Sequence, residues 1–235
     1  MKLDIINIDN LKKIKGKKRY RNKHPLLPQH PFNMLIVGPT NCGKTNMLMN
    51  LILKFSTFDK LYIYSKHLHQ PKMQLLEDIF DKVLEKTDED ILTMSNTLDD
   101  LPPVDDIDPD VQNLIIFDDM ICEPNLTPVV DYFIRGRHSN CSTIFLSQIY
   151  TKIPRQIRLN THYFCFFNTP NRLEINIINN DCNYELEKED FKNRFKKAVS
   201  KKFDFFFIDN KTTNKALKYR KNFNYVEEKD LSGNF

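Results

Sequence analysis

Residues 38–45 constrain this chain more than any other segment, because they read Gly-Pro-Thr-Asn-Cys-Gly-Lys-Thr. The two glycines and the closing Lys-Thr have the spacing of a phosphate-binding loop. Glycine lets the backbone of such a loop curl so that its N–H groups face a phosphate. An apolar run at 34–37 precedes the loop, and a segment with helical periodicity at 45–55 follows it. This is the strand–loop–helix context that the motif requires.

The loop predicts a site for ATP and Mg²⁺. Lys44 is expected to reach the β- and γ-phosphates, and the Thr45 hydroxyl is expected to bind Mg²⁺. The backbone of the whole loop would surround the phosphates. The expected nucleotide-binding residues are Gly38, Pro39, Thr40, Asn41, Cys42, Gly43, Lys44 and Thr45.

Apolar runs alternate with segments of helical periodicity along the chain. We predict strands at 34–37, 60–64, 91–94, 113–117, 142–146, 162–167 and 203–208, and helices at 45–55, 71–86, 125–135, 153–159, 171–180 and 186–200. Strands that are apolar throughout are typical of parallel sheets covered on both faces. The pattern therefore predicts an α/β protein, a three-layer P-loop NTPase of the RecA-like (ASCE) type with a mostly parallel central sheet.

Two further strand ends carry polar side chains, and ligands of open parallel sheets lie beyond the carboxyl ends of the strands. The run 114–117 ends in Asp118-Asp119. We expect Asp118 to hold Mg²⁺ through water and Asp119 to polarise the attacking water. The run 144–146 ends in Ser147-Gln148. If its strand lies between the loop strand and the acidic strand, Gln148 would contact the γ-phosphate and the water.

Arginine is scarce in this chain, with nine residues against 26 lysines, yet four of the nine fall between residues 135 and 158. Arginine supplies a planar fork of donors that lysine lacks. We expect an arginine finger in this cluster, acting on the ATP of a neighbouring subunit, with Arg137 ahead of Arg135. An ordinary surface ion pair is the alternative.

Charge is distributed unevenly around a net value of +4. Eight Lys or Arg fall within 12–23, and nine Asp or Glu fall within 88–110. We predict a basic arm over 1–30, an ATPase domain over 31–210 and a basic tail over 211–235. Lys218 and Arg220 lie in that tail among aromatic residues, which is consistent either with nucleic-acid contact or with a loosely packed tail.

Other signals are weaker. No window approaches 18 consecutive apolar residues, and the N-terminus lacks a secretory signal, so we expect an intracellular protein without a membrane span. His67 and His69 form an HxH pair with no third ligand nearby in sequence, which favours a surface loop over a metal site. The five cysteines lack CxxC spacing and are expected to be reduced thiols.

Taken in order, the segments MLIVGPTNCGKTNML, LIIFDDM and FIRGRHSNCSTIFLSQIYTKIPRQIRLN resemble the viral genome-packaging ATPases of the FtsK–HerA superfamily. The chain looks most like the poxvirus-type enzymes found in large DNA viruses, virophages and Polinton-like elements. The resemblance spans about residues 32–180. Asp119 stands where many members of the superfamily carry glutamate.

The resemblance implies a motor that drives double-stranded DNA into a preformed capsid. It also implies a homo-oligomeric ring of five or six subunits, capsid vertex proteins as partners, and action in the host cytoplasm at the viral factory, with the virion as a second location. The matching positions are Lys44, Thr45, Asp118, Asp119 and Gln148, with an arginine from the 135–137 pair.

Two other functions fit a phosphate-binding loop. A GTPase-type switch would carry an Asn-Lys-x-Asp motif, but Asn210-Lys-Thr-Thr213 lacks the acidic residue. A non-catalytic scaffold could keep the fold without hydrolysis, although Lys44, Thr45, Asp118 and Gln148 then have no purpose as a set.

Overall fold

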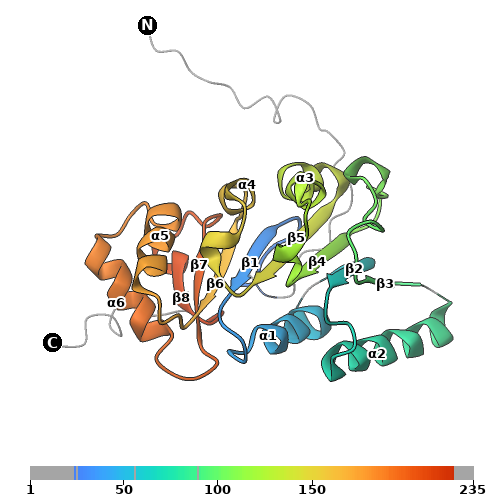
Figure 1. Cartoon of the computed structure of the whole chain (residues 1–235), viewed down its shortest axis with the longest axis horizontal. Coiled ribbons are helices and arrows are strands. Elements are labelled where there is room, and N and C mark those ends of the chain that lie inside the picture. Colours follow the sequence, from blue (N-terminus) through green and yellow to red (C-terminus); the bar gives the residue numbers. More distant parts are fainter. Residues whose placement is uncertain (1–23, 25, 56, 89, 225–235) are drawn as a thin grey trace, which may run out of the picture.

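The computed structural model describes residue 24 and residues 26–55, 57–88 and 90–224 (Figure 1). Most of the expected basic arm, and the last part of the expected tail, lie outside the described residues. The described part forms one eight-stranded sheet with helices on both faces. The α/β fold class with a mostly parallel central sheet is confirmed.

The strand order is β3-β2-β4-β5-β1-β6-β7-β8. The first six strands of this order run parallel, and β7 and β8 add antiparallel pairings at the far edge. The strands are β1 (Asn33–Val37), β2 (Lys60–Ser65), β3 (Leu92–Ser95), β4 (Asn113–Asp118), β5 (Cys141–Ser147), β6 (Tyr163–Phe167), β7 (Phe205–Asp209) and β8 (Tyr219–Lys221). Each predicted strand is present within two residues of its predicted ends.

The helices divide between the two faces of the sheet (Figure 1). Apolar residues of α1 and α2 pack on one face, and those of α3 to α6 pack on the other. The helices are α1 (Lys44–Asn50), which continues as a π-helical turn over Leu51–Phe55, α2 (Pro71–Thr87), α3 (Thr127–Arg135), α4 (Arg155–Leu159), α5 (Arg172–Cys182), α6 (Lys188–Ala198) and α7 (Lys215–Lys218). Because both faces are covered, β1, β4, β5 and β6 are buried along their whole length.

The position of β5 decides where the polar strand ends meet. β5 pairs with β1 on one side and with β4 on the other. Val37 lies opposite Ser147, and Asp118 lies opposite Leu146. The three strands therefore end at one level of the same edge, and the residues that follow them are brought together.

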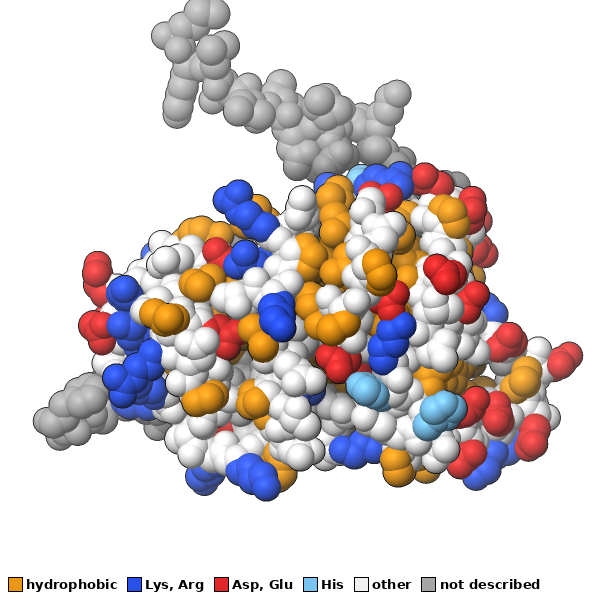
Figure 2. Space-filling view, viewed as in Figure 1, with side chains coloured by type: hydrophobic (Ala, Val, Ile, Leu, Met, Phe, Trp, Pro, Cys, Tyr) orange, Lys and Arg blue, Asp and Glu red, His pale blue; other side chains and the backbone are white. Residues whose placement is uncertain are grey.

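The acidic segment 95–110 is a surface loop, as predicted, but apolar residues anchor it. Leu98, Leu101, Val104 and Ile107 are buried in the core, whereas the aspartates between them are exposed. The Tyr132 hydroxyl of α3 donates to the Pro102 carbonyl at 2.7 Å. In Figure 2, acidic side chains gather on the side of this loop and of α2, and Lys and Arg side chains gather over α5 and α6.

The sequence prediction is wrong at the end of the chain. The sheet does not end near residue 210, because α7 and β8 lie beyond it and β8 pairs with β7. Lys218 and Arg220, expected in a tail, are buried. The Arg220 guanidinium pairs with Asp209, donates to the Leu26 carbonyl at 2.7 Å and lies 4.4 Å from the centroid of the Phe207 ring. Residues 211–221 thus belong to the folded domain.

The start of β7 also differs from the prediction. The strand begins at Phe205, so Phe203 lies outside it, with φ 73° and an exposed side chain. Among the described residues, no helix is long and apolar enough to cross a membrane.

Candidate active site

The phosphate-binding loop leaves β1 at the carboxyl edge of the sheet, and its two glycines are required by its geometry. The Gly38 N–H donates to the Ser147 carbonyl at 3.1 Å, which ties the loop to β5. A Cβ on Gly38 would lie 2.6 Å from Cβ of Phe167 and 2.8 Å from Sγ of Cys42. Gly43 has φ +110°, a conformation that side chains rarely adopt. Both positions therefore exclude larger residues.

Lys44 begins α1 and turns back over the loop. Its Nζ donates to the Gly38 carbonyl at 2.6 Å and to the Pro39 carbonyl at 2.9 Å. These contacts hold the ammonium group above the centre of the loop. The ammonium group therefore lies against the loop, from where the lysine of such a motif reaches a bound phosphate.

Asp118 ends β4 and is 9% exposed. Its Oδ2 accepts a hydrogen bond from the Ser65 hydroxyl at 3.4 Å. Burial, and next the neighbouring Asp119 carboxylate, raise the pKa of Asp118, and Lys44 acts against them. The ionised form of Asp118 is therefore poorly compensated by the protein, and a cation placed beside it would be strongly favoured.

Asp119 lies at the centre of a chain of hydrogen bonds. The Gln148 side-chain amide donates to Asp119 Oδ2 at 3.4 Å, and the Thr40 hydroxyl donates to Gln148 Oε1 at 3.2 Å. Nε2 of His67 lies 3.2 Å from the same Asp119 oxygen. Asp119 itself has φ 56°, so the extended conformation of β4 ends at Asp118. The chain links the phosphate-binding loop to a carboxylate that is open to solvent on one side.

A cavity of about 170 Å³ collects these groups. It is lined by Thr40, Asn41, Lys44, Thr45, His67, Gln70, Asp118, Asp119, Leu146, Ser147 and Gln148. Expected residues from all three strand ends thus face one space, whereas Gly38, Pro39, Cys42 and Gly43 of the loop are not part of its lining.

The cavity fits Mg²⁺ by the chemistry of its oxygen atoms. Among the described residues no cluster of three His, Cys, Asp or Glu side chains could bind a metal on its own. Mg²⁺ does not need one, because it is usually held by one or two carboxylates together with substrate phosphates and water. The Thr45 hydroxyl and the Asp118 carboxylate, both on the cavity wall, are ligands of that kind.

The two candidate finger residues lie at the amino ends of the strands, on the side of the sheet away from the cavity. Arg135 ends α3, and Arg137 lies in the turn that leads to the amino end of β5. The seven residues of β5 separate that edge from the cavity by about 20 Å. Arg135 is bound to Asp105 and Asp131, each at 3.0 Å, whereas the Arg137 side chain is exposed. Neither can reach the cavity of its own chain.

The comparisons with known proteins agree with this geometry. The model of the poxvirus A32 protein family matches residues 17–219, most of the chain. The chain belongs to this family. The family of genome-packaging ATPases that the sequence indicated is therefore confirmed, and so is the assignment as an ATPase.

Among solved structures, the DNA-packaging ATPase B204 from Sulfolobus turreted icosahedral virus is similar, with 13% identity and a TM-score of 0.56 over 83% of this chain and 98% of that chain. B204 from Sulfolobus turreted icosahedral virus 2, in complex with AMP, matches with 14% identity and a TM-score of 0.54 over 82% of this chain and 96% of that chain. At this identity the likeness shows the fold. No curated protein matches the sequence.

Sequence reasoning did not find two residues that this A32-family protein brings to the site, His67 and Gln70. They follow β2, which pairs in parallel with β4 in the register that sets Ser65 opposite Asp118. The sequence pattern of His67 and His69 was considered only as a possible metal site, and the lack of a third ligand favoured a surface loop. The signal that was available is positional, because parallel neighbouring strands end at the same edge.

Proposed function

We propose that this ATPase is a translocase that moves double-stranded DNA and packages a viral genome into a preformed capsid. One observation carries the catalytic part of the proposal: β5 lies between β1 and β4, so that Gln148 bridges the loop residue Thr40 and the carboxylate Asp119. The A32 family carries the packaging part. The complexes of B204 with AMP and with ATP-gammaS support ATP as the nucleotide.

The residues divide the work of hydrolysis between binding and water activation. The loop 38–45 binds the phosphates through its N–H groups, and Lys44 neutralises charge on the β- and γ-phosphates. Thr45 and Asp118 hold Mg²⁺, which supplies charge neutralisation to the phosphate oxygens when it is bound.

Asp119 accepts a proton from the attacking water, and Gln148 holds that water and the γ-phosphate in line. Asp119 is one methylene shorter than glutamate. The water must therefore lie closer to the strand end, and His67 and Gln148 hold the carboxylate on the cavity wall.

Catalysis is completed between subunits of a ring. Arg137 is exposed at the edge of the sheet opposite to the cavity, and a head-to-tail ring places that edge against the next subunit's cavity. Arginine there stabilises the charge that develops on the transferred phosphate. Five or six subunits, docking on capsid vertex proteins and action in the host cytoplasm follow from the same family-level reasoning.

The test is the rate of ATP hydrolysis with and without long duplex DNA at low salt. We expect duplex DNA to stimulate hydrolysis, Lys44→Ala to abolish it, and Lys82→Ala on the exposed face of α2 to leave it unchanged. Heparin at equal charge controls for a general polyanion effect. Failure of duplex DNA both to bind and to stimulate would remove the translocase assignment while leaving the ATPase.

A further inference from the structure

A second and larger cavity, of about 520 Å³, opens beside the phosphate-binding loop. It shares Asn41, Lys44, Thr45 and Gln70 with the smaller cavity that holds the carboxylates. Its remaining lining comes from Gly43, Asn46, Pro71, Lys72, Lys202 and Phe203. The two cavities are therefore neighbours along the loop, one on the side of Asp119 and the other on the side of the segment before β7.

Phe203 stands out in this lining because of its backbone. Within the part of the chain that the structure describes, six residues other than glycine have positive φ, and five of them are Asn or Asp, which tolerate that conformation. Phe203, with φ 73°, is the sixth. A bulky side chain there is strained, and such strain persists where the surrounding structure or a function requires it.

The Phe203 ring is exposed and lies against the loop. It is 58% exposed, although phenylalanine is ordinarily buried. A Cβ added to Gly43 would be 3.2 Å from Cδ1 of this ring, so the ring edge touches the loop backbone. Nζ of Lys202 lies over one face of the ring, 4.9 Å from the centroid. The ring thus has one face against a cation and one edge against the loop, which leaves its opposite face as the apolar surface next to the atoms that hold phosphate.

We propose that Phe203 is the platform on which the purine base of the nucleotide stacks. This inference rests on the proposed function, which places the phosphates in the loop. A nucleotide with its γ-phosphate near Asp119 must extend its ribose and base out of the 170 Å³ cavity, and the 520 Å³ cavity is the neighbouring space that shares Lys44 and Thr45 with it. An aromatic ring offers a purine its π-face, and stacking is the main contact that a flat base can make there.

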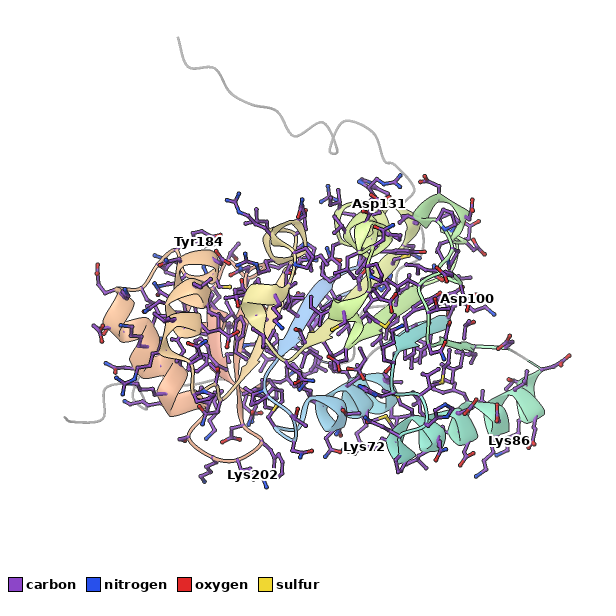
Figure 3. All side chains as sticks on the ribbon, in the orientation of Figure 1. Lys72, Lys86, Asp100, Asp131, Tyr184 and Lys202 are labelled. Carbon is purple, nitrogen blue, oxygen red and sulfur yellow. The ribbon has the colours of Figure 1, made fainter. Side chains whose placement is uncertain are left out.

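The polar rim of the cavity suits the rest of the nucleotide. Lys202 precedes the platform and Lys72 lies in the first turn of α2, and Figure 3 shows both on the same side of the molecule as α1. Their ammonium groups can pair with the α-phosphate or the ribose hydroxyls. Every base has a π-face, so the platform binds adenine and guanine alike and contributes affinity more than selectivity.

The alternative is that Phe203 serves only to pack on Gly43 and shape the loop. The two roles differ in what they do to a ligand without a base. A platform affects ATP and not inorganic tripolyphosphate, whereas a packing role affects both, because both use the loop.

The test is calorimetric binding of ATP and of tripolyphosphate, each with Mg²⁺, to the full chain. Phe203→Gly removes the ring and suits the positive φ, so the protein is expected to fold at least as well. We expect ATP binding to weaken about tenfold and tripolyphosphate binding to stay unchanged. Phe203→Trp, which keeps an aromatic ring, should bind ATP about as tightly as the wild type. Tyr184→Ala, which removes an aromatic ring that is 73% exposed away from the cavity, is the matched control.

Two results would overturn the platform: ATP binding that is unchanged in Phe203→Gly, or tripolyphosphate binding that falls by the same factor as ATP binding. If the unmodified protein binds tripolyphosphate and ATP equally well, the base has no site and the platform is wrong, although the loop is right. If it binds neither ligand, the nucleotide site itself is wrong and the proposed function fails with it.

Discussion

At the scale of single residues, the sequence predicts the candidate catalytic residues but not the residues that contact them. Asp118, Asp119 and Gln148 follow apolar strands, and the rule that ligands lie beyond strand ends was sufficient to group them. His67 escaped because a histidine in a turn has no periodic signature, and its value comes from a contact with Asp119 across two strands. Phe203 was missed because it belongs to an apolar run in the sequence, and its positive φ angle cannot be predicted from that run.

Replacing Asp118 by a neutral residue is expected to raise the stability of the fold and to abolish hydrolysis. Burial raises its pKa, so the folded state favours the protonated form, and its ionised form destabilises the protein at every pH above that raised pKa. We expect Asp118→Asn to raise the melting temperature at pH 7 by about 2–4 °C, corresponding to about 1 kcal/mol, and to abolish hydrolysis with Mg²⁺.

The pH dependence checks the cause. The stability advantage of Asp118→Asn should shrink as the pH falls through the raised pKa of Asp118, because the wild-type carboxyl is then protonated as well. Thermal unfolding of both proteins between pH 7 and pH 4 measures this difference. A constant difference over that range would show that charge at Asp118 is not responsible.

His67 is expected to position Asp119 rather than to bind substrate. Replacing it by alanine removes one of the two side chains that hold the carboxylate, so kcat should fall about tenfold with little change in KM for ATP. His67→Gln, which keeps a donor, should recover part of the loss. His69→Ala, outside the cavity, is the control for the HxH pair. A change in KM alone would assign His67 to nucleotide binding instead.

At the scale of elements, apolar runs located the strands of the parallel part, because burial on both faces leaves a continuous signal. β8 was missed because it has three residues, two of them basic, and its burial depends on partners distant in sequence. Arg220 is 1% exposed only because Asp209 and the Leu26 carbonyl meet its guanidinium. The sequence pattern does not show that the Arg220 guanidinium is paired with a carboxylate.

The Arg220–Asp209 pair predicts strong coupling between β8 and β7. Arg220→Met leaves the partly buried Asp209 carboxylate without its cation, with only the backbone N–H groups of Lys211 and Thr212 donating to it, so the free energy of unfolding should fall by about 3 kcal/mol. Adding Asp209→Asn removes the uncompensated charge and should recover part of that loss. Urea unfolding measures both, with Arg172→Met at an exposed position as control. A loss below about 1 kcal/mol in the single variant would show that β8 is not an integral strand.

At the scale of the whole molecule, the candidate catalytic residues are divided between the two ends of the parallel strands. The cavity lies at the carboxyl ends, and the exposed Arg137 lies at the amino ends. If Arg137 is the finger of the proposed ring, the site is complete only between subunits. The sequence indicated an arginine finger from residue preference, and the distance across β5 is what excludes action within one chain.

Mixing two inactive variants tests that arrangement. Arg137→Ala and Lys44→Ala chains should each be inactive alone. In mixed rings about a quarter of the interfaces pair an intact loop with an intact arginine, and activity should return to about that fraction. Arg135→Ala, whose side chain is bound to Asp105 and Asp131, is the matched variant and should retain hydrolysis. Absence of any recovery would place the arginine requirement elsewhere.

Gln148, which follows β5 between β1 and β4, is expected to act on the hydrolysis of bound ATP. The decisive experiment is single-turnover hydrolysis by Gln148→Ala, measured together with ATP affinity and beside the exposed control Gln156→Ala. We expect an ATP affinity within about threefold of the wild type and a hydrolysis rate lower by about 100-fold. A Gln148→Ala protein that hydrolyses bound ATP at the wild-type rate would show that Gln148 has no part in hydrolysis.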